Sequence, residues 1–399
     1  MEASAEDAPR SDPAYFGGYA KISIHEQMLK DVMRTNAYRC AIEGNPGLFH
    51  GKVVLDVGCG TGVLSMFCAR AGARRVYGVD ASAIIDSART IVRANGLHNV
   101  VTLVKGKMEE VELPGIAPGE VDIIVSEWMG YFLVFESMLD SVLFARDKWL
   151  RSEADGGLLL PSNATLYVAA LEDGFGRDDR VGYWHRAWGF DMGVLADCAR
   201  HEPCTHIVDP GQIVSNAQPV LRLDLRRVAR GSVLEAFEPF RLTIARHDCL
   251  HALAFYFDCS FAPAMTALAP APEYEPFTHS QSCEAREVVL ETGPASPPTH
   301  WMQSIFYLKR EFTVAPGDII DGTITCKVNK HDTRALDVAF ELTLQLEDNI
   351  TSASTKVHDA SSEAHVNEEE ENDDEEEEKA EACMLRLHEE FCFRTELRY

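Results

Sequence analysis

The chain divides into two regions with different patterns of apolar and polar residues. Between residues 53 and 150, short β-branched runs alternate with longer stretches in which apolar residues recur every three or four positions. The runs predict buried strands at residues 53–57, 75–79, 100–104 and 121–125, and the stretches predict helices at 63–71, 82–94 and 136–150. Strands alternating with helices form a parallel sheet covered by helices, so this region is predicted to be a Rossmann-like α/β domain.

A helix is predicted ahead of this domain. Ile24, Met28 and Val32 recur at helical spacing, and the pattern continues until Gly-Asn-Pro-Gly at 44–47 ends it. One helix is therefore expected from residue 23 to residue 43. Residues 1–14 are polar and are expected to form a flexible N-terminus, so the first domain is predicted to span residues 15–160.

Helical periodicity largely disappears after Pro161, where we place the domain boundary. Alternating apolar and polar residues at 220–228, 250–261, 299–314 and 323–328 are separated by turns rich in Pro and Gly. This pattern predicts an antiparallel, barrel-like β domain over residues 161–399. An aromatic segment at about 181–205, with Trp184, Trp188 and Phe190, predicts a helical arm that projects from this domain.

Length and composition are those of a soluble enzyme of two or three domains. The 399 residues are 46% hydrophobic and 25% charged. We find neither an apolar run long enough to cross a bilayer nor the pattern of a secretion signal. The 11 cysteines are scattered, without zinc-ligand spacing. We therefore expect no metal site and a reducing location, in the cytoplasm, the nucleus or both.

The charge is strongly negative and unevenly distributed. The formal net charge is −26, and residues 359–381 contain 13 acidic residues and one lysine. This run is too polar to be buried, so a disordered acidic insert is expected at about residues 352–382. An acidic protein repels nucleic acid and anionic membranes, so cationic partners are favoured over either of these.

A glycine-rich turn follows the first predicted strand. Gly58, Gly60 and Gly62 lie between that strand and a helix, where backbone can approach a ligand closely. A dinucleotide fingerprint would need glycine at position 63, which is Val63, and Asp56 would repel a pyrophosphate. A nicotinamide cofactor is therefore disfavoured, and a plain structural turn with a helix-capping Asp stays an alternative.

The next predicted strand ends in Asp80, where a carboxylate can accept hydrogen bonds from ribose hydroxyls. S-adenosylmethionine combines a ribose with a cationic sulfonium and carries no diphosphate. Acidic groups such as Asp56 and Asp80 are complementary to this cofactor.

Two glutamates bracket an apolar, aromatic segment further along the chain. Glu127 comes at the end of the strand run VDIIVS, which starts at residue 121, and Glu136 follows nine residues later, after Gly130. Two carboxylates in such surroundings are costly without a cation. A guanidinium matches them, because it is planar, permanently charged and able to donate bidentate hydrogen bonds. The alternative is a pair of acids on a surface loop.

Four separated motifs together resemble the type I protein arginine methyltransferases. They are YFGGYAKISIHEQML at 15–29, VLDVGCGTG at 54–62, SEWMGYFLVFE at 126–136 and Thr-His-Trp at 299–301. The resemblance covers about residues 13–350 and the final strands. It implies S-adenosylmethionine as cofactor, monomethyl and then asymmetric dimethyl arginine as products, and a homodimer formed through the arm. It also implies arginine-rich basic proteins, such as RNA-binding proteins or histones, as substrates.

The resemblance also implies roles for single residues. Glu127 and Glu136 match the catalytic glutamate pair, and His300 matches a histidine that pairs with an aspartate, here Asp31. Substrate contacts are expected from Tyr19, Met28, Met138 and Trp301. Cofactor contacts are expected from Tyr15, Phe16, His25, Arg34, Asp56, Gly58, Gly60, Asp80, Met108 and Glu109, with Arg34 pairing the carboxylate of the cofactor. Many relatives have Glu where this chain has Asp80, and the acidic insert has no counterpart in the family pattern.

Two other functions compete with this interpretation. A methyltransferase of the same fold could act on a small molecule, but such an enzyme would not need two facing glutamates. A catalytically weak scaffold could use its acidic surface to hold basic proteins. Intact cofactor and glutamate motifs argue against such a scaffold, and cofactor binding distinguishes the two cases.

Overall fold

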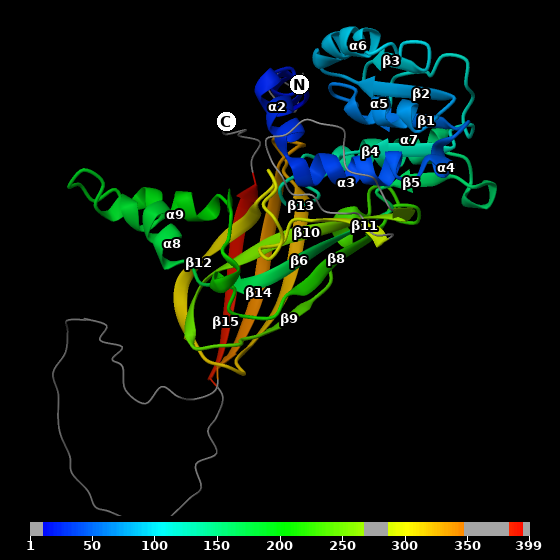
Figure 1. Cartoon of the computed structure of the whole chain (residues 1–399). Coiled ribbons are helices and arrows are strands. Elements are labelled where there is room, and N and C mark those ends of the chain that lie inside the picture. Colours follow the sequence, from blue (N-terminus) through cyan, green and yellow to red (C-terminus); the bar gives the residue numbers. More distant parts are fainter. Residues whose placement is uncertain (1–10, 267–285, 347–382, 394–399) are drawn as a thin grey trace, which may run out of the picture.

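The computed structural model describes residues 11–266, 286–346 and 383–393, which form an α/β domain joined to an antiparallel β domain (Figure 1). The parallel sheet of the α/β domain has the strand order β3-β2-β1-β4-β5. Its strands are β1 (Val53–Val57), β2 (Arg75–Asp80), β3 (Val101–Lys105), β4 (Ile123–Ser126) and β5 (Leu158–Leu160). The helices between them are α5 (Val63–Arg70), α6 (Ile84–Ala94) and α7 (Met138–Trp149). The predicted Rossmann-like arrangement is confirmed, and β5 is a strand that the sequence pattern did not reveal.

The helix predicted at residues 23–43 is wrong, because the chain forms two helices there. Helix α2 (Ile22–Lys30) and helix α3 (Val32–Glu43) are separated at Asp31, whose backbone is extended with a ψ of 96°. The Asp31 carboxylate accepts a hydrogen bond from the Arg34 N–H and thereby caps α3. Helix α1 (Ser11–Gly18) begins inside the segment expected to be flexible, and the short helix α4 (Pro46–Phe49) precedes β1.

The β domain is antiparallel, as predicted, and its described strands form two sheets. Their strand orders are β7-β12-β10-β6-β8, with β11 paired to β10, and β15-β14-β13-β9. Phe255, Phe306, Phe340 and Phe391 pack against one another between the sheets and are buried. The strands are β6 (Asn163–Leu171), β7 (Cys204–His206), β8 (Gln218–Asp224), β9 (Phe240–Thr243), β10 (Asp248–Thr266), β11 (Arg286–Glu291), β12 (Gln303–Val314), β13 (Ile319–Val328), β14 (Leu336–Leu346) and β15 (Cys383–Phe393). The acidic insert expected at 352–382 lies outside the described residues.

A helical arm projects from the β domain (Figure 1). It comprises α8 (Gly174–Arg180), the 3₁₀ turn η2 (Gly182–His185) and α9 (Val194–His201), so it begins before the predicted residue 181. Trp188 is 90% exposed and Phe190 is 67% exposed, and both lie in the segment between η2 and α9. Other 3₁₀ turns are η1 (Glu153–Asp155), η3 (Pro210–Gln212) and η4 (Val233–Glu235). Among the described helices, none combines the length and apolar character needed to cross a membrane.

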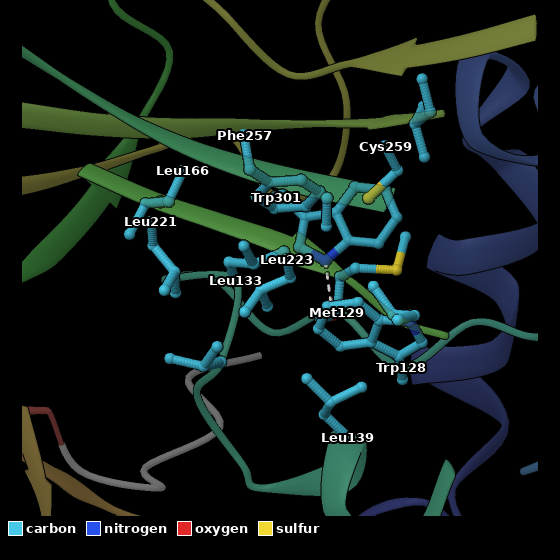
Figure 2. Close-up of a cluster of buried hydrophobic side chains, with 14 of the residues drawn as sticks. Trp128, Met129, Leu133, Leu139, Leu166, Leu221, Leu223, Phe257, Cys259 and Trp301 are labelled. Carbon is cyan, nitrogen blue, oxygen red and sulfur yellow. Dashed lines mark hydrogen bonds between the residues drawn. The ribbon is translucent and has the colours of Figure 1, made fainter. Parts of the chain in front are cut away.

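The two domains share one hydrophobic core. Figure 2 shows Trp128, Met129 and Leu133 of the α/β domain packed among side chains of the β domain that include Phe257 and Trp301. The indole N–H of Trp301 donates to the Met129 carbonyl at 2.9 Å. The loop between β4 and α7 is therefore fixed against the β domain.

Candidate active site

A cavity of about 600 Å³ lies at the carboxyl ends of β1, β2 and β4, next to α1 and α2. This is the place where open α/β sheets bind ligands. The predicted site residues line this cavity except for Asp31 and Asp56. The predicted residues in the lining are Tyr15, Phe16, Tyr19, His25, Met28, Arg34, Gly58, Gly60, Asp80, Met108, Glu109, Glu127, Glu136, Met138, His300 and Trp301.

The glycine turn after β1 keeps one end of the cavity open. Gly58 has a φ of 71°, and a Cβ there would lie 2.2 Å from the Met138 side chain. A Cβ at Gly60 would lie 3.3 Å from the His25 ring. Both positions require backbone without a side chain, so a ligand can approach the turn closely.

Asp80 is held at the same end by hydrogen bonds from its neighbours. One carboxylate oxygen accepts from the Gly60 N–H at 2.9 Å, and the other accepts from the Ser82 N–H at 2.8 Å and hydroxyl at 2.7 Å. Helix α6 has Ala83 as its N-cap, so Asp80 does not cap it. The carboxylate is thus held at the cavity lining, and the oxygen that accepts from Gly60 can accept a further hydrogen bond, because a carboxylate offers about four acceptor sites.

Asp56 lies beneath the cavity and does not line it. Its side chain is fully buried and accepts a hydrogen bond from the Ser65 hydroxyl at 2.6 Å. Burial raises the pKa of Asp56 to about 7. The Asp56 side chain is therefore bonded to α5 and is not part of the cavity lining, and its direct contact with a cofactor stays a prediction.

The loop that carries the two glutamates has an unusual backbone. Leu133, Glu136 and Ser137 adopt positive φ values of 56°, 73° and 56°. A Cβ at Gly130 would lie 2.4 Å from the Phe135 carbonyl, so this position requires glycine. Positive φ values are costly for residues other than glycine and persist where surrounding contacts hold them. Some of these contacts come from the β domain, where the Arg334 carbonyl accepts from the Glu136 N–H and the Thr333 carbonyl accepts from the Ser137 hydroxyl.

Glu127 forms a buried ion pair with Arg34 of α3. The Nε and Nη2 atoms of Arg34 donate to one Glu127 oxygen at 2.9 and 2.8 Å. The other oxygen accepts from the Met129 N–H at 3.3 Å. A carboxylate offers about four acceptor sites, so Glu127 retains capacity for a second cation.

Glu136 is buried and accepts a hydrogen bond from the Tyr19 hydroxyl at 2.7 Å. Burial raises the pKa of Glu136 to about 7, although the Tyr19 bond and the positive charge of Arg334 act in the opposite direction. Glu136 can therefore exchange a proton near neutral pH.

Asp31 and His300 join the N-terminal helices to the β domain. The His300 ring Nδ1 lies 2.7 Å from an Asp31 oxygen, which also accepts from the His300 N–H at 2.8 Å. Burial alone would raise the pKa of Asp31, but hydrogen bonds from His300 and Arg34 hold it below its ordinary value. The predicted pair is therefore brought together, behind the cavity wall that His300 helps to form.

The charges around the cavity favour a cationic ligand. Lining carboxylates outnumber lining lysines and arginines by six to three among the described residues. The acids are Asp80, Glu109, Glu110, Glu127, Glu136 and Asp140, and the cations are Arg34, Lys107 and Arg334. Within the same described part of the chain, no group of three His, Cys, Asp or Glu side chains is arranged to hold a metal ion.

Arg334 is a cavity residue that sequence reasoning missed. It lies in the loop between β13 and β14, its guanidinium stacks on the Tyr15 ring at 4.2 Å, and it donates to the Glu136 carbonyl at 2.7 Å. No motif surrounds Arg334 in the sequence, so its position near Glu136 follows from the folded structure alone.

Comparisons with known proteins agree with this arrangement. The arginine methyltransferase oligomerization subdomain matches residues 162–348, and a methyltransferase domain matches residues 54–148. Protein arginine N-methyltransferase 1 of Schizosaccharomyces pombe is 44% identical over 340 residues, covering 85% of this chain and 92% of the relative. The protein of the same name from Oryza sativa subsp. indica is 43% identical over 324 residues, covering 81% and 77%.

A solved structure is similar over nearly the whole chain. The PRMT1 enzyme-prozyme heterotetrameric complex of Trypanosoma brucei with AdoHcy matches with a TM-score of 0.74 and 33% identity. The match covers 94% of this chain and 100% of that chain. The chain therefore belongs to the protein arginine N-methyltransferase family.

Proposed function

We propose that this protein is a type I protein arginine N-methyltransferase that forms monomethyl and then asymmetric dimethyl arginine. One observation carries the proposal: a single cavity has a glycine turn with a fixed Asp80 at one end and the Glu127/Glu136 pair at the other. The first end suits a nucleoside, and the second suits a guanidinium.

S-adenosylmethionine fits the first end of the cavity. When bound, this cofactor supplies a methyl group on a positively charged sulfonium, which the acidic lining favours. Asp80 would accept from the ribose hydroxyls, and Met108 and Glu109 would lie beside the adenine. Arg34 has five N–H donors, so it can pair the carboxylate of the cofactor while it holds Glu127. Tyr15 and Phe16 would cover the bound molecule.

The two glutamates would counter the low nucleophilicity of the arginine side chain. A guanidinium has a pKa above about 12 and a delocalised lone pair, so it is a poor nucleophile. Glu127 and Glu136 would bind the guanidinium and draw positive charge toward the nitrogens that do not react. One terminal nitrogen would then be oriented for attack, and electrostatic stabilisation would act where charge changes.

The reacting nitrogen must also lose a proton after methylation. Glu136 is the best acceptor in the cavity, because its pKa lies close to neutral. The Asp31–His300 pair would orient the N-terminal helices against the cavity. Met28 and Met138 would pack beside the side chain of the substrate arginine, and their flexibility would let monomethyl arginine enter again.

Charge and exposed apolar side chains support the expected partners. The net charge of −26 and the acidic cavity suit arginine-rich basic proteins, such as RNA-binding proteins or histones.

Trp188 and Phe190 are too exposed for a stable monomer surface, so the arm is proposed to form a homodimer. Sedimentation should show a dimer that Trp188→Ala together with Phe190→Ala dissociates. An active wild-type monomer would contradict this assembly. The scattered cysteines favour the cytoplasm, the nucleus or both.

The activity is tested by methyl transfer to matched peptides. An arginine-rich peptide and the same peptide with every arginine replaced by lysine are incubated with cofactor labelled in its methyl group. Label on the arginine peptide alone is expected. Cofactor binding with no transfer to either peptide would instead favour the scaffold, and transfer to free small molecules in preference to the arginine peptide would favour the other methyltransferase.

A further inference from the structure

Arg334 contacts the two parts of the cavity that must act together. It belongs to the β domain, yet it reaches the N-terminal segment and the glutamate loop, which are far from it in the sequence. Its neighbour Thr333 also takes part, because the Thr333 carbonyl accepts from the Ser137 hydroxyl at 3.2 Å.

The first contact fixes the backbone of Glu136 on both sides. The Glu136 N–H donates to the Arg334 carbonyl at 3.2 Å, and Arg334 Nη1 donates to the Glu136 carbonyl at 2.7 Å. Glu136 has a positive φ of 73°, a conformation that its own chemistry disfavours. This reciprocal pair of hydrogen bonds therefore holds the Glu136 backbone in its positive-φ conformation.

The second contact is with the aromatic residues of α1. The Arg334 guanidinium lies 4.2 Å from the centroid of the Tyr15 ring and 5.8 Å from that of Phe16. A planar guanidinium stacks well on such rings, and the interaction is stronger when water is excluded. Tyr15 is buried, so the stack is a closed contact and not a surface encounter.

We infer that Arg334 is a positioning residue that couples the closure of α1 over the cofactor to the placement of Glu136. This inference rests on the proposed function, which assigns the cofactor to Tyr15 and the substrate guanidinium to Glu136. Binding of the cofactor orders Tyr15 and Phe16, these rings fix Arg334, and Arg334 fixes the Glu136 backbone. The acceptor end is thereby complete when the donor end is occupied.

Cofactor binding tests the coupling without turnover. S-adenosylhomocysteine is titrated calorimetrically into wild type, Arg334→Ala, Tyr15→Leu and the double variant. Each single change is expected to weaken binding about fivefold, and the double change no more than about tenfold, because the residues act through one contact. Arg310→Ala is the matched control, since Arg310 stacks on Phe312 in the same domain at 5.6 Å and does not line the cavity.

The pH dependence of kcat/KM for an arginine peptide separates the effect of charge from the effect of stacking. Glu136 is faced by Tyr15 and Tyr19 from the N-terminal segment, by Glu127 from its own loop and by Arg334. Removing the positive charge should raise the pKa of Glu136, so the acidic limb for Arg334→Ala should move about half a pH unit or more to higher pH. Arg334→Lys keeps the charge and should keep the limb, while it still loses most of the coupling to Tyr15.

Specific results would overturn the inference. One such result is that Arg334→Ala keeps both its S-adenosylhomocysteine affinity and its kcat within twofold of wild type. Another is that the losses of S-adenosylhomocysteine binding free energy in Tyr15→Leu and Arg334→Ala add up in the double variant. A shift of the acidic limb in Arg310→Ala as large as the shift in Arg334→Ala would also overturn the inference. If Arg334→Ala melts below the assay temperature, Arg334→Lys carries the binding cycle. If wild type transfers no methyl to arginine, the proposed function fails, whereas the binding cycle still decides whether Arg334 and Tyr15 are coupled.

Discussion

The two ends of the cavity are built in different ways. At the cofactor end, the bonds that fix Asp80 come from Gly60 and Ser82, at most 20 positions away in the sequence. At the glutamate end, Glu136 is bonded to Tyr19, 117 positions away, and to Arg334, 198 positions away. The first end is a local product of the βαβ pattern, and the second is assembled by the whole fold.

The aromatic core explains how the second end is assembled. Phe132 and Phe135 of the glutamate loop pack on Phe393 of β15, with ring centroids 5.9 and 4.9 Å apart. Phe132 also packs on Phe255 and Phe306 of the β domain. The loop is therefore supported by strands near the end of the chain. Changes at the glutamate end should consequently lower kcat more than cofactor affinity, and changes at the cofactor end should lower cofactor affinity more than kcat.

The largest effect is expected at the glutamate end from Glu127→Gln. Loss of the charge that faces the guanidinium should lower kcat at least 100-fold, about 2.7 kcal/mol, because the interaction acts in the transition state. Affinity for S-adenosylhomocysteine should stay within a few fold. Steady-state kinetics measures kcat and calorimetry measures the affinity. The control is Glu110→Gln, which changes an exposed residue of the cavity lining. More than about a tenth of the wild-type rate would refute this role for Glu127.

The cofactor end should respond in the opposite way to Asp80→Ala. Loss of charge-assisted hydrogen bonds to the ribose should weaken the cofactor by about 1–3 kcal/mol, roughly five- to 150-fold, while kcat at saturation changes less. Calorimetric titration gives the affinity. The control is Asp86→Ala, which removes an exposed aspartate that pairs with Arg89 and Lys105 and does not line the cavity. This change should leave the cofactor affinity unchanged. Equal cofactor affinity in wild type and Asp80→Ala would mean that Asp80 has a purely structural role.

The difference between the two ends also decides what the sequence could predict. The strands, the glycine turn and Asp80 follow from short-range patterns, and the structure places them accordingly. The break at Asp31 was missed because its second partner, His300, lies 269 positions away. Arg334 carries no motif, and Asp56 points toward Ser65 because side chains alternate along β1. Glu127 and Glu136 were identified by a family motif, but the contacts that fix Glu136 could not be read from it.

The pKa of Glu136 predicts how activity depends on pH. Burial raises this pKa to about 7, so the carboxyl is protonated below that value and ionised above it. Because the ionised form is the one proposed to bind the guanidinium, kcat/KM for an arginine peptide should fall about tenfold for each pH unit below 7 and level off above it. A pH profile measured with saturating cofactor checks this. A flat profile from pH 5.5 to 8 would contradict the assigned protonation.

A smaller effect at the glutamate end is expected from Phe393→Leu. The shorter side chain should loosen the Phe135 contact, lower kcat about three- to tenfold and cost about 1 kcal/mol of unfolding free energy. Cofactor affinity should hardly change, because the cofactor end does not depend on β15. Thermal unfolding, kinetics and calorimetry give the three values. A weakened cofactor with unchanged kcat would reverse the proposed division of the cavity.

The smallest effect concerns the acidic residues 359–381, which lie outside the described residues. Their net charge of −12 should raise the local concentration of basic substrates. A Gly/Ser replacement should raise the KM for a long arginine-rich protein about two- to threefold at low salt, without changing kcat. The effect should vanish near 1 M salt, where the Debye length is about 3 Å. Short peptides serve as the control, and equal KM values at low salt would leave the segment without a role in capture.

The identity of the methylated product decides whether this protein forms asymmetric dimethyl arginine. An arginine-rich protein is methylated with labelled cofactor and hydrolysed, and the methylarginines are separated by chromatography at several times. We expect monomethyl arginine early and asymmetric dimethyl arginine later, because the Glu127/Glu136 pair and the flexible Met28 let the same terminal nitrogen return. Symmetric dimethyl arginine as the sole dimethylated product, or label on residues other than arginine, would contradict the proposed type I activity.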